Sequence, residues 1–446
     1  MNFDIIILGA GPGGYETAVE AAREGLSVAV VERDHLGGTC LNRGCIPTKA
    51  LLRSAEVLDI INRAEEFGVT VNVAAIDYSR AVERKNSVVG QLREGVATLL
   101  SNPLITVVKG EGEIVSPSEV KVGDTLLTAD RAIIIATGSA PAALPIEGAD
   151  LTITSDDLLA MTDLPKSMVI IGGGVIGLEF AGILNSFGVD VTVVEFCKEI
   201  LPNFDHDIAK RLRTSMSRRG VTFAVSAAVT GVSVADDGRR IVTYDRKGKV
   251  ASFEAEAVLM AVGRRPVVPK GVEEAGVAVG RRGIEVYDNM LTSVAGVYAI
   301  GDVNGRCMLA HAASAQGKVA LAHILGRKSA INLDVVPSAV FTSPEAAMVG
   351  LTEEAATDRG VEYDVRRTTF RANGKALAMG ESDGLVKILK AKESGKIIGC
   401  HVLGPHASDL VAGTALAISR GLTAADILST IHSHPTLSEV IISALN

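Results

Sequence analysis

The sequence is poor in several residue types and patterns, and each shortage argues against a class of protein. It has no Trp, and aromatic residues make up only 4%, so a bound cofactor must be held mainly by contacts other than aromatic stacking. Acidic residues number 52 against 44 basic ones, and no Lys/Arg run occurs, which argues against nucleic-acid binding. Apolar runs such as 132–136 are far shorter than a membrane span. We therefore expect neither a nucleic-acid partner nor a membrane partner.

Targeting signals and a cysteine framework are also missing. The chain enters an apolar strand within its first residues, which leaves no room for a signal or transit peptide. A cytoplasmic location is predicted, with the mature form of an organellar protein as the alternative. Five cysteines do not suggest a structural disulfide framework in that compartment. A close cysteine pair there is more typical of a catalytic or metal-binding site.

Two segments of the chain look like copies of each other. Residues 4–32 and 168–195 each read as an apolar strand, a Gly-rich turn, an amphipathic helix and a second apolar strand ending in Glu. Each copy is followed later by a further apolar strand ending in Gly, at 132–138 and 257–263. After Pro337 strand-like and helical stretches alternate without a Gly-rich turn. The fold class predicted is α/β, with two Rossmann-like nucleotide-binding domains and a C-terminal α+β domain.

The Gly-rich turns carry the dinucleotide fingerprint in full context. In such a turn the glycines permit a tight bend and let a pyrophosphate approach the helix N-terminus, and a carboxylate about 20 residues on binds the ribose. An ordinary Gly-rich turn is the alternative reading, but strand, helix and acidic residue all fit here. The first set is Gly9, Gly11, Gly14 and Glu32, and the second is Gly172, Gly174, Gly177 and Glu195.

The acidic residue of the second copy bears on cofactor choice. Glu195 would repel a 2′-phosphate, and no Arg follows it directly. NAD is therefore favoured over NADP, although Lys198 stands close enough in sequence to leave NADP open.

Cys40 and Cys45 form the one close cysteine pair. Five residues of regular helix would separate their Cα atoms by roughly 7.5 Å along the axis, and a disulfide needs less than about 7 Å. A bridge therefore requires a distorted backbone, which Gly44 can supply, and a distorted bridge is easy to reduce. A zinc site would need two further ligands at suitable spacing, and Cys197, Cys307 and Cys400 are scattered singly. No metal site is predicted.

These segments together resemble the flavoprotein disulfide reductases, the class I pyridine nucleotide-disulfide oxidoreductase family. The resemblance rests on GGTCLNRGCIPTK at 37–49, the two Gly-rich turns, AIGD at 299–302 and HSHPTLSE at 432–439. Within that family the sequence is most similar to the dihydrolipoamide dehydrogenases, through GVIGLE at 174–179, Glu195, MLAH at 308–311 and PSAVFTSPEAAMVGLTE at 337–353.

The resemblance implies a domain plan and a partner. It places an FAD domain at 1–145, an NAD domain at 146–265, a central segment returning to FAD at 266–335 and an interface domain at 336–446. It implies a homodimer in which each active site borrows a His–Glu pair from the other subunit. The short stretch after Glu439 suggests that part of the dimer edge differs from that of other members.

The resemblance also assigns roles by position. Cys40 would exchange with the dithiol substrate, Cys45 would face the flavin, and His434 would be the general base, oriented by Glu439. Lys49 would lie near flavin N5, with Glu179 close to it on the nicotinamide side. Further FAD contacts would come from Thr39, Gly112, Thr137, Gly138, Asp302 and Ala310, and further NAD contacts from Val229 and Gly263.

The reaction implied is oxidation of a protein-bound dihydrolipoyl group by NAD through FAD and the Cys40–Cys45 disulfide. The partner would be a lipoyl-bearing protein of a 2-oxoacid dehydrogenase or glycine-cleavage complex. Three other functions stay open, namely a mercuric reductase, an NAD(P)-dependent reductase of another small disulfide, and a flavin-binding scaffold without activity. The absent N-terminal and C-terminal cysteine pairs weigh against the first, and Glu195 weighs against a glutathione-type enzyme. The complete Cys40, Cys45 and His434 set weighs against a scaffold.

Overall fold

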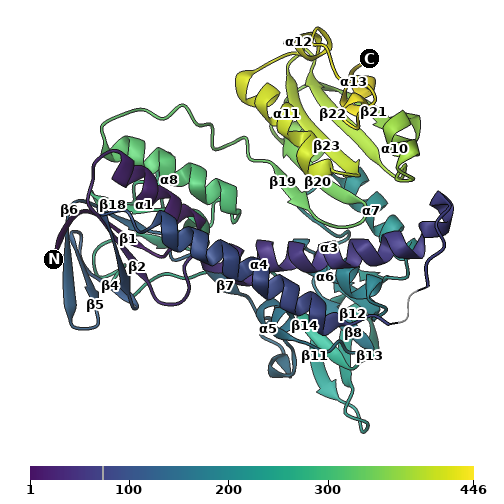
Figure 1. Ribbon diagram of the computed structural model, residues 1–446, viewed down its shortest axis with the longest axis horizontal. Helices are drawn as coiled ribbons and strands as arrows, with labels where there is room; N and C mark the ends of the chain where they lie inside the picture. Colours follow the sequence, from purple (N-terminus) through teal and green to yellow (C-terminus); the bar gives the residue numbers. More distant parts are fainter. Residues whose placement is uncertain (73–74) are drawn as a thin grey trace. The chain divides into compact units, whose positions relative to one another are not determined.

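The chain crosses between two structural units several times, so neither unit is a continuous stretch of sequence. The computed structural model describes residues 1–72 and 75–446. The first unit contains residues 1–51, 79–142 and 264–333, and the second contains 52–78, 143–263 and 334–446 (Figure 1).

The first unit is built on a sheet whose central strands are parallel, in the order β3-β2-β1-β6, with β18 also beside β6. Isoleucines and valines with no exposed surface fill β1, β2 and the end of β6, as expected for a sheet covered on both faces. β4 and β5 extend β6 as an antiparallel meander. The strands are β1 (Asn2–Leu8), β2 (Val28–Glu32), β3 (Ile105–Lys109), β4 (Gly112–Ser116), β5 (Glu119–Val122), β6 (Thr125–Ile135) and β18 (Val297–Ala299).

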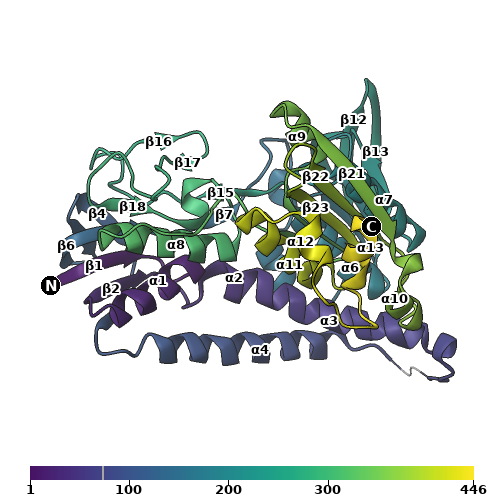
Figure 2. The same cartoon turned by 90° about the horizontal axis from the view of Figure 1, so that it is seen from above.

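Helices cover one face of this sheet and an irregular segment covers the other. Side chains of α1 and α8 pack on one face, and apolar side chains between residues 272 and 286 pack on the other. Figure 2 shows α1 and α8 side by side. The helices of this part are α1 (Pro12–Arg23), α2 (Gly38–Arg43), α4 (Tyr78–Leu99) and α8 (Ala310–Ile324), with the 3-10 turn η3 (Gly301–Asn304). α3 (Cys45–Asn62) begins in this unit, and its residues from 52 onward belong to the second unit. The short strands are β7 (Ser139–Pro141), β15 (Arg264–Pro266), β16 (Val279–Gly280) and β17 (Gly283–Ile284).

The second unit repeats the same plan in a smaller sheet. Its parallel strands run in the order β10-β9-β8-β14, which matches β3-β2-β1-β6 strand for strand, and an antiparallel meander β11-β12-β13 follows. The strands are β8 (Ser167–Ile171), β9 (Asp190–Glu195), β10 (Thr222–Val225), β11 (Ala228–Val234), β12 (Arg240–Arg246), β13 (Lys249–Ala255) and β14 (Ala257–Met260). The helices are α5 (Ser155–Ala160), α6 (Val175–Ser186) and α7 (His206–Arg218). The predicted duplication is therefore confirmed.

The C-terminal part of the second unit is a five-stranded antiparallel sheet, in the order β19-β20-β23-β22-β21, with helices packed on it. This confirms the predicted α+β segment. The strands are β19 (Ser338–Val340), β20 (Glu345–Gly350), β21 (Tyr363–Thr369), β22 (Leu385–Ala391) and β23 (Ile397–Gly404). The helices are α9 (Glu353–Asp358), α10 (Gly374–Ala378), α11 (Ala407–Arg420), α12 (Ala424–Leu428) and α13 (Glu439–Leu445). A short 3-10 turn lies in this part at Phe370–Ala372, and two others lie earlier in the second unit at Ala64–Phe67 and Ala149–Leu151.

Two strand predictions were too long. The strands predicted at 132–138 and 257–263 end at Ile135 and Met260. Gly138 and Gly263 have φ of 72° and 112°, so the chain turns away at each glycine instead of extending the strand. Among the described residues no helix combines the length and the apolar character needed to cross a bilayer.

Candidate redox and nucleotide sites

Both Gly-rich turns join a buried strand to a 12-residue helix, α1 or α6. A Cβ on Gly9 or Gly172 would lie 2.4 Å from the carbonyl oxygen of Ala136 or Ala261, so neither position admits a side chain. By contrast, a Cβ on Gly174 would meet nothing within 4 Å. Each turn therefore packs tightly against the protein at its first glycine. The space beside Gly174 is free, so a phosphate could approach the backbone there.

The first amide groups of α1 and α6 suit an anionic ligand. The N-cap residues are Gly11 and Gly174, and no side chain of the described residues caps either helix. The N–H groups of a first turn have no partner within the helix and carry a partial positive charge. Gly14 and Gly177 bring each helix against its own strand, because a Cβ there would lie 1.9 or 2.1 Å from the oxygen of Gly9 or Gly172.

The two acidic residues make the same contacts in both copies. Glu32 accepts hydrogen bonds from the amides of Ala10 (2.8 Å) and Asp34 (2.7 Å). Glu195 accepts from the amides of Gly173 and Cys197, both at 2.6 Å. Each carboxylate is buried and thus held against its own Gly-rich turn, in the place where the fingerprint puts a ribose.

The two cysteines lie on either side of a break between helices. α2 ends at Arg43 and α3 begins at Cys45, with Gly44 between them. The Cys40 and Cys45 thiols are hydrogen-bonded to each other and are not joined by a disulfide. A Cβ on Gly44 would lie 3.0 Å from the oxygen of Thr39 and 3.3 Å from Cα of Cys40. The predicted distortion at Gly44 is confirmed by the break between the two helices.

The surroundings of Cys40 disfavour ionisation of its thiol. The hydrogen bond with Cys45, together with burial, raises the pKa of the Cys40 thiol, and the charge of Lys49 acts in the opposite direction. Lys49 stands four residues after Cys45 on α3, on the same helix face.

The other predicted FAD contacts of the first unit are distributed over several of its elements. Asp302 accepts a 2.5 Å hydrogen bond from the hydroxyl of Ser139, which in turn accepts one at 2.7 Å from Arg264. Thr137 donates to the oxygen of Val267 at 2.6 Å. Thr39 lies on α2, Gly112 begins β4 beside Leu8, Gly138 is in the turn after β6, and Ala310 begins α8.

Glu179 is a buried carboxylate in the first turns of α6. Its Oε1 accepts a hydrogen bond from the amide of Phe341 at 3.0 Å, just after β19. Gly263 lies in an open turn after β14, and Val229 pairs with Tyr244 between β11 and β12.

The C-terminal His–Glu pair is present as predicted. His434 Nδ1 and Glu439 Oε1 lie 2.9 Å apart, and Glu439 Oε2 accepts from the amide of Thr436 at 2.8 Å. These hydrogen bonds lower the pKa of Glu439, the amide contributing most. The His434 side chain is 79% exposed, so its ring is available to another molecule.

Three side chains that no sequence pattern indicated contact these groups from distant parts of the chain. Arg93 contacts Asn42 between the two cysteines, Arg264 acts on Asp302 through Ser139, and Gln316 accepts from the amide of Gly301 at 2.7 Å. No motif includes Arg93 or Gln316, because the contacts join segments far apart in the chain.

Two family models together match nearly the whole chain. Residues 3–317 match the pyridine nucleotide-disulphide oxidoreductase model, and residues 336–445 match the dimerisation domain of the same family. This chain belongs to the pyridine nucleotide-disulphide oxidoreductase family. Proteins of this family are oxidoreductases that use FAD and NAD.

Individual relatives cover the chain from end to end. A dihydrolipoyl dehydrogenase of Chlamydia muridarum is 43% identical over 98% of this chain and 95% of its own length. One from Geobacillus stearothermophilus is 40% identical over 99% of this chain and 95% of its own. Among solved structures, the Cu(II) complex of the HOCl-induced flavoprotein disulfide reductase RclA from Escherichia coli has a TM-score of 0.88 at 29% identity. That match covers 100% of this chain and 99% of the reductase.

Proposed function

We propose that this chain is a dihydrolipoyl dehydrogenase, which oxidises protein-bound dihydrolipoyl groups and reduces NAD. The observation that supports this most is the pair of adjacent thiols, Cys40 and Cys45, between α2 and α3 with the charge of Lys49 beside them. A dithiol substrate can exchange with such a pair without any other reagent. The named relatives, at about 40% identity over nearly the full chain, support the same substrate.

Each cofactor is assigned to one copy of the Gly-rich unit. In our proposal 1–145 and 266–335 hold FAD, 146–265 hold NAD, and 336–446 form the dimer contact. FAD, when bound, would supply the redox chemistry that links the reduced cysteines to NAD. The first set of candidate contacts is Gly9, Gly11, Gly14, Glu32, Thr39, Lys49, Gly112, Thr137, Gly138, Asp302 and Ala310. The second is Gly172, Gly174, Gly177, Glu179, Glu195, Val229 and Gly263.

The residues of the chain carry out the exchange of sulfur bonds. The base His434 takes a proton from one substrate thiol, because the thiolate is the nucleophile. That sulfur attacks Sγ of Cys40, the Cys40–Cys45 bond breaks, and Cys45 leaves as a thiolate. The second substrate thiol attacks the first substrate sulfur, the bond to Sγ of Cys40 breaks, and the proton of the second thiol passes to the departing Cys40 sulfur. This releases the oxidised lipoyl group and leaves Cys40 reduced. Two electrons have then passed from the substrate to the cysteine pair.

The base comes from the second subunit of a homodimer in this proposal. The dimerisation domain of the family at 336–445 supports the dimer. The exposed ring of His434, held from behind by Glu439, suits a base that acts on another subunit. We further propose a cytoplasmic location and a lipoyl-bearing partner from a 2-oxoacid dehydrogenase or glycine-cleavage complex.

A paired substrate assay tests the function. The purified flavoprotein should oxidise dihydrolipoamide with NAD, and it should not reduce glutathione disulfide with NADPH. The Cys45→Ser variant should lose the dihydrolipoamide reaction and also the long-wavelength absorbance that a thiolate next to flavin produces. Faster turnover of glutathione disulfide with NADPH, or full activity in Cys45→Ser, would contradict the proposal.

Cofactor choice is tested at Glu195. Replacing Glu195 with Ala removes the carboxylate that should repel a 2′-phosphate, so the preference for NAD over NADP should fall. The matched control is Glu256→Ala, whose carboxylate accepts from the amide of Lys166 outside the Gly-rich turn. The ratio of kcat/KM for the two nucleotides should change only in Glu195→Ala.

A further inference from the structure

The helix that carries Cys40 is fastened at Asn42, between the two cysteines. The Asn42 Nδ2 group donates to the oxygens of Leu36 (2.9 Å) and Gly38 (2.8 Å). Its Oδ1 accepts from two nitrogens of Arg93, Nε at 3.0 Å and a terminal guanidinium nitrogen at 2.8 Å. Both ends of the amide are thus engaged, one on the start of α2 and the other on α4.

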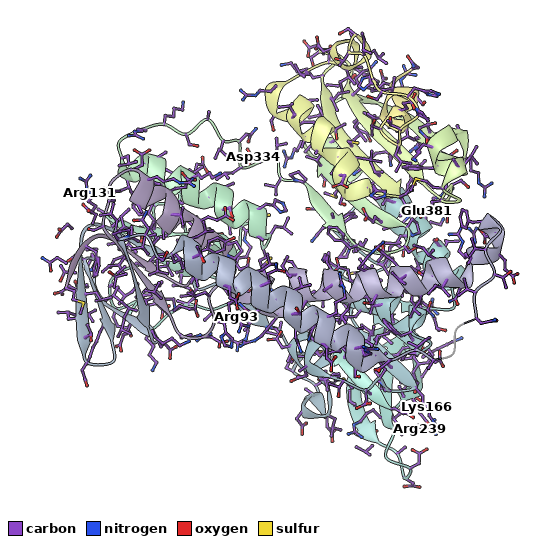
Figure 3. All side chains as sticks on the ribbon, viewed as in Figure 1. Arg93, Arg131, Lys166, Arg239, Asp334 and Glu381 are labelled. Atoms are coloured by element: carbon purple, nitrogen blue, oxygen red, sulfur yellow. The ribbon has the colours of Figure 1, made fainter. Side chains whose placement is uncertain are left out.

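Arg93 determines which way this amide points. A guanidinium only donates hydrogen bonds, so it must face the oxygen of Asn42 and not its NH₂ group. The NH₂ group is thereby directed at the turn that precedes α2. Arg93 is half-buried on α4, a helix of 22 residues, and Figure 3 labels it there. A long helix thus holds a short one through a single amide.

α2 needs such support because it is weak by itself. It has only six residues, far fewer than an isolated helix needs to be stable. It begins after two glycines, Gly37 and Gly38, with φ of 94° and 60°. It is also followed by the break at Gly44. Apart from Asn42, its N-terminal turn is held by the hydrogen bond from the amide of Gly37 to the oxygen of Ala10, at 2.8 Å.

We propose that Arg93 is a positioning residue for the redox pair, acting through Asn42 to hold Cys40 next to Cys45. The inference rests on the proposed function in one respect, that the pair cycles between dithiol and disulfide. Holding two thiols together raises their effective concentration, which favours the disulfide. Without Arg93 the start of α2 moves more freely, and the disulfide becomes easier to reduce.

The test measures the equilibrium of the pair directly. Holoenzyme is equilibrated in glutathione buffers of graded ratio, thiols are trapped by alkylation, and the oxidised fraction at 40–45 is read by mass spectrometry. We expect Arg93→Ala to lower the equilibrium constant for disulfide formation about tenfold, which equals a rise of about 30 mV in reduction potential. Arg93→Lys has no guanidinium fork and should lie between Arg93→Ala and the unmodified protein.

A double-mutant cycle shows whether Arg93 acts through Asn42. Asn42→Ala should shift the constant as much as Arg93→Ala, and the double variant should shift it no further. The matched control is Arg84→Ala. Arg84 is another arginine of α4, and it donates a hydrogen bond to the main-chain oxygen of Ala50 on α3 at 3.2 Å. This control should leave the potential of the pair unchanged.

The outcomes distinguish the proposed role of Arg93 from the proposed function of the protein. An unchanged potential in a folded Arg93→Ala protein, or additive shifts in the cycle, would overturn the role of Arg93 alone. A protein in which 40–45 never form a disulfide in any buffer would overturn both. A shifted potential together with no turnover of dihydrolipoamide would overturn only the substrate assignment.

Discussion

Lys387 Nζ lies 2.8 Å from Oδ2 of Asp205, and the two side chains are 3% and 0% exposed. Asp205 is the N-cap of α7, and Lys387 belongs to β22 of the C-terminal sheet. The ammonium group also contacts Asp207 at 2.9 Å and Glu353. This buried ion cluster therefore joins the smaller parallel-sheet region to the C-terminal sheet within the second unit.

Removing the cation should destabilise the second unit strongly. Lys387→Met leaves the carboxylate of Asp205 buried without its partner, and breaking a buried pair in this way costs about 3–5 kcal/mol. Unfolding in urea should be followed by circular dichroism, because the chain has no Trp for fluorescence.

Two further variants make the Lys387 measurement specific. Lys390→Met removes a neighbouring, more exposed pair, Lys390–Asp364 at 3.5 Å, and should cost less than about 1 kcal/mol. Lys387→Met combined with Asp205→Asn should recover much of the loss, because no unpaired charge then stays buried. Equal losses in the two single variants would contradict this account.

His401 should make stability depend on pH below neutrality. Burial lowers the pKa of His401 beneath its ordinary value of 6.5, and its Nε2 lies 2.9 Å from the oxygen of Leu351. The unfolded chain therefore takes up a proton near pH 6.5 that the folded chain refuses. Stability should fall as the pH drops below that value, by at most about 1.4 kcal/mol per pH unit.

The measurement is the free energy of unfolding at pH 7.5 and pH 5.5. In His401→Gln this acid loss should be smaller, since glutamine keeps a donor for Leu351 but does not titrate. His406→Gln is the control, because the His406 side chain is 58% exposed. The same pH dependence in all three proteins would show that His401 is not its source.

Gly44→Ala should disturb the junction between α2 and α3. The new Cβ would meet Thr39 and Cys40 at 3.0–3.3 Å, and forcing a methyl group into such a place costs about 1–3 kcal/mol. We expect slower formation of the Cys40–Cys45 disulfide, measured by alkylation at timed intervals after addition of oxidised glutathione. Gly90→Ala on α4, where a Cβ meets nothing within 4 Å, should not slow it.

Glu439→Gln should reduce turnover while leaving the fold intact. The carboxylate holds Nδ1 of His434, and a glutamine oriented by the Thr436 amide offers that ring a weaker, uncharged partner. Loss of an effective general base lowers kcat by about 10²–10⁴-fold. Glu362→Gln replaces a carboxylate that is 82% exposed and should keep full activity. A kcat in Glu439→Gln equal to that control would remove Glu439 from the active site.

The sequence was sufficient to predict local structure that depends on neighbours in the chain. Gly9, Gly11 and Gly14 with Glu32, and their counterparts around Glu195, follow from local spacing, because strand, turn and helix form one continuous unit. The need for a break at Gly44 also followed from local geometry, since a regular helix cannot bring Cys40 to Cys45. The pairing of His434 with Glu439 was proposed from a resemblance over eight residues.

Only the tertiary structure determined which side chains distant in sequence contact one another. Arg93 contacts Asn42, 51 residues away in sequence, and Lys387 contacts Asp205, 182 residues away. From sequence alone, a charged residue on a helix or strand is predicted to face solvent. The periodicity shows which face of the element the residue lies on, but it does not show which other segments pack against that face. Packing likewise gave His401 its buried position on β23, and with it the lowered pKa.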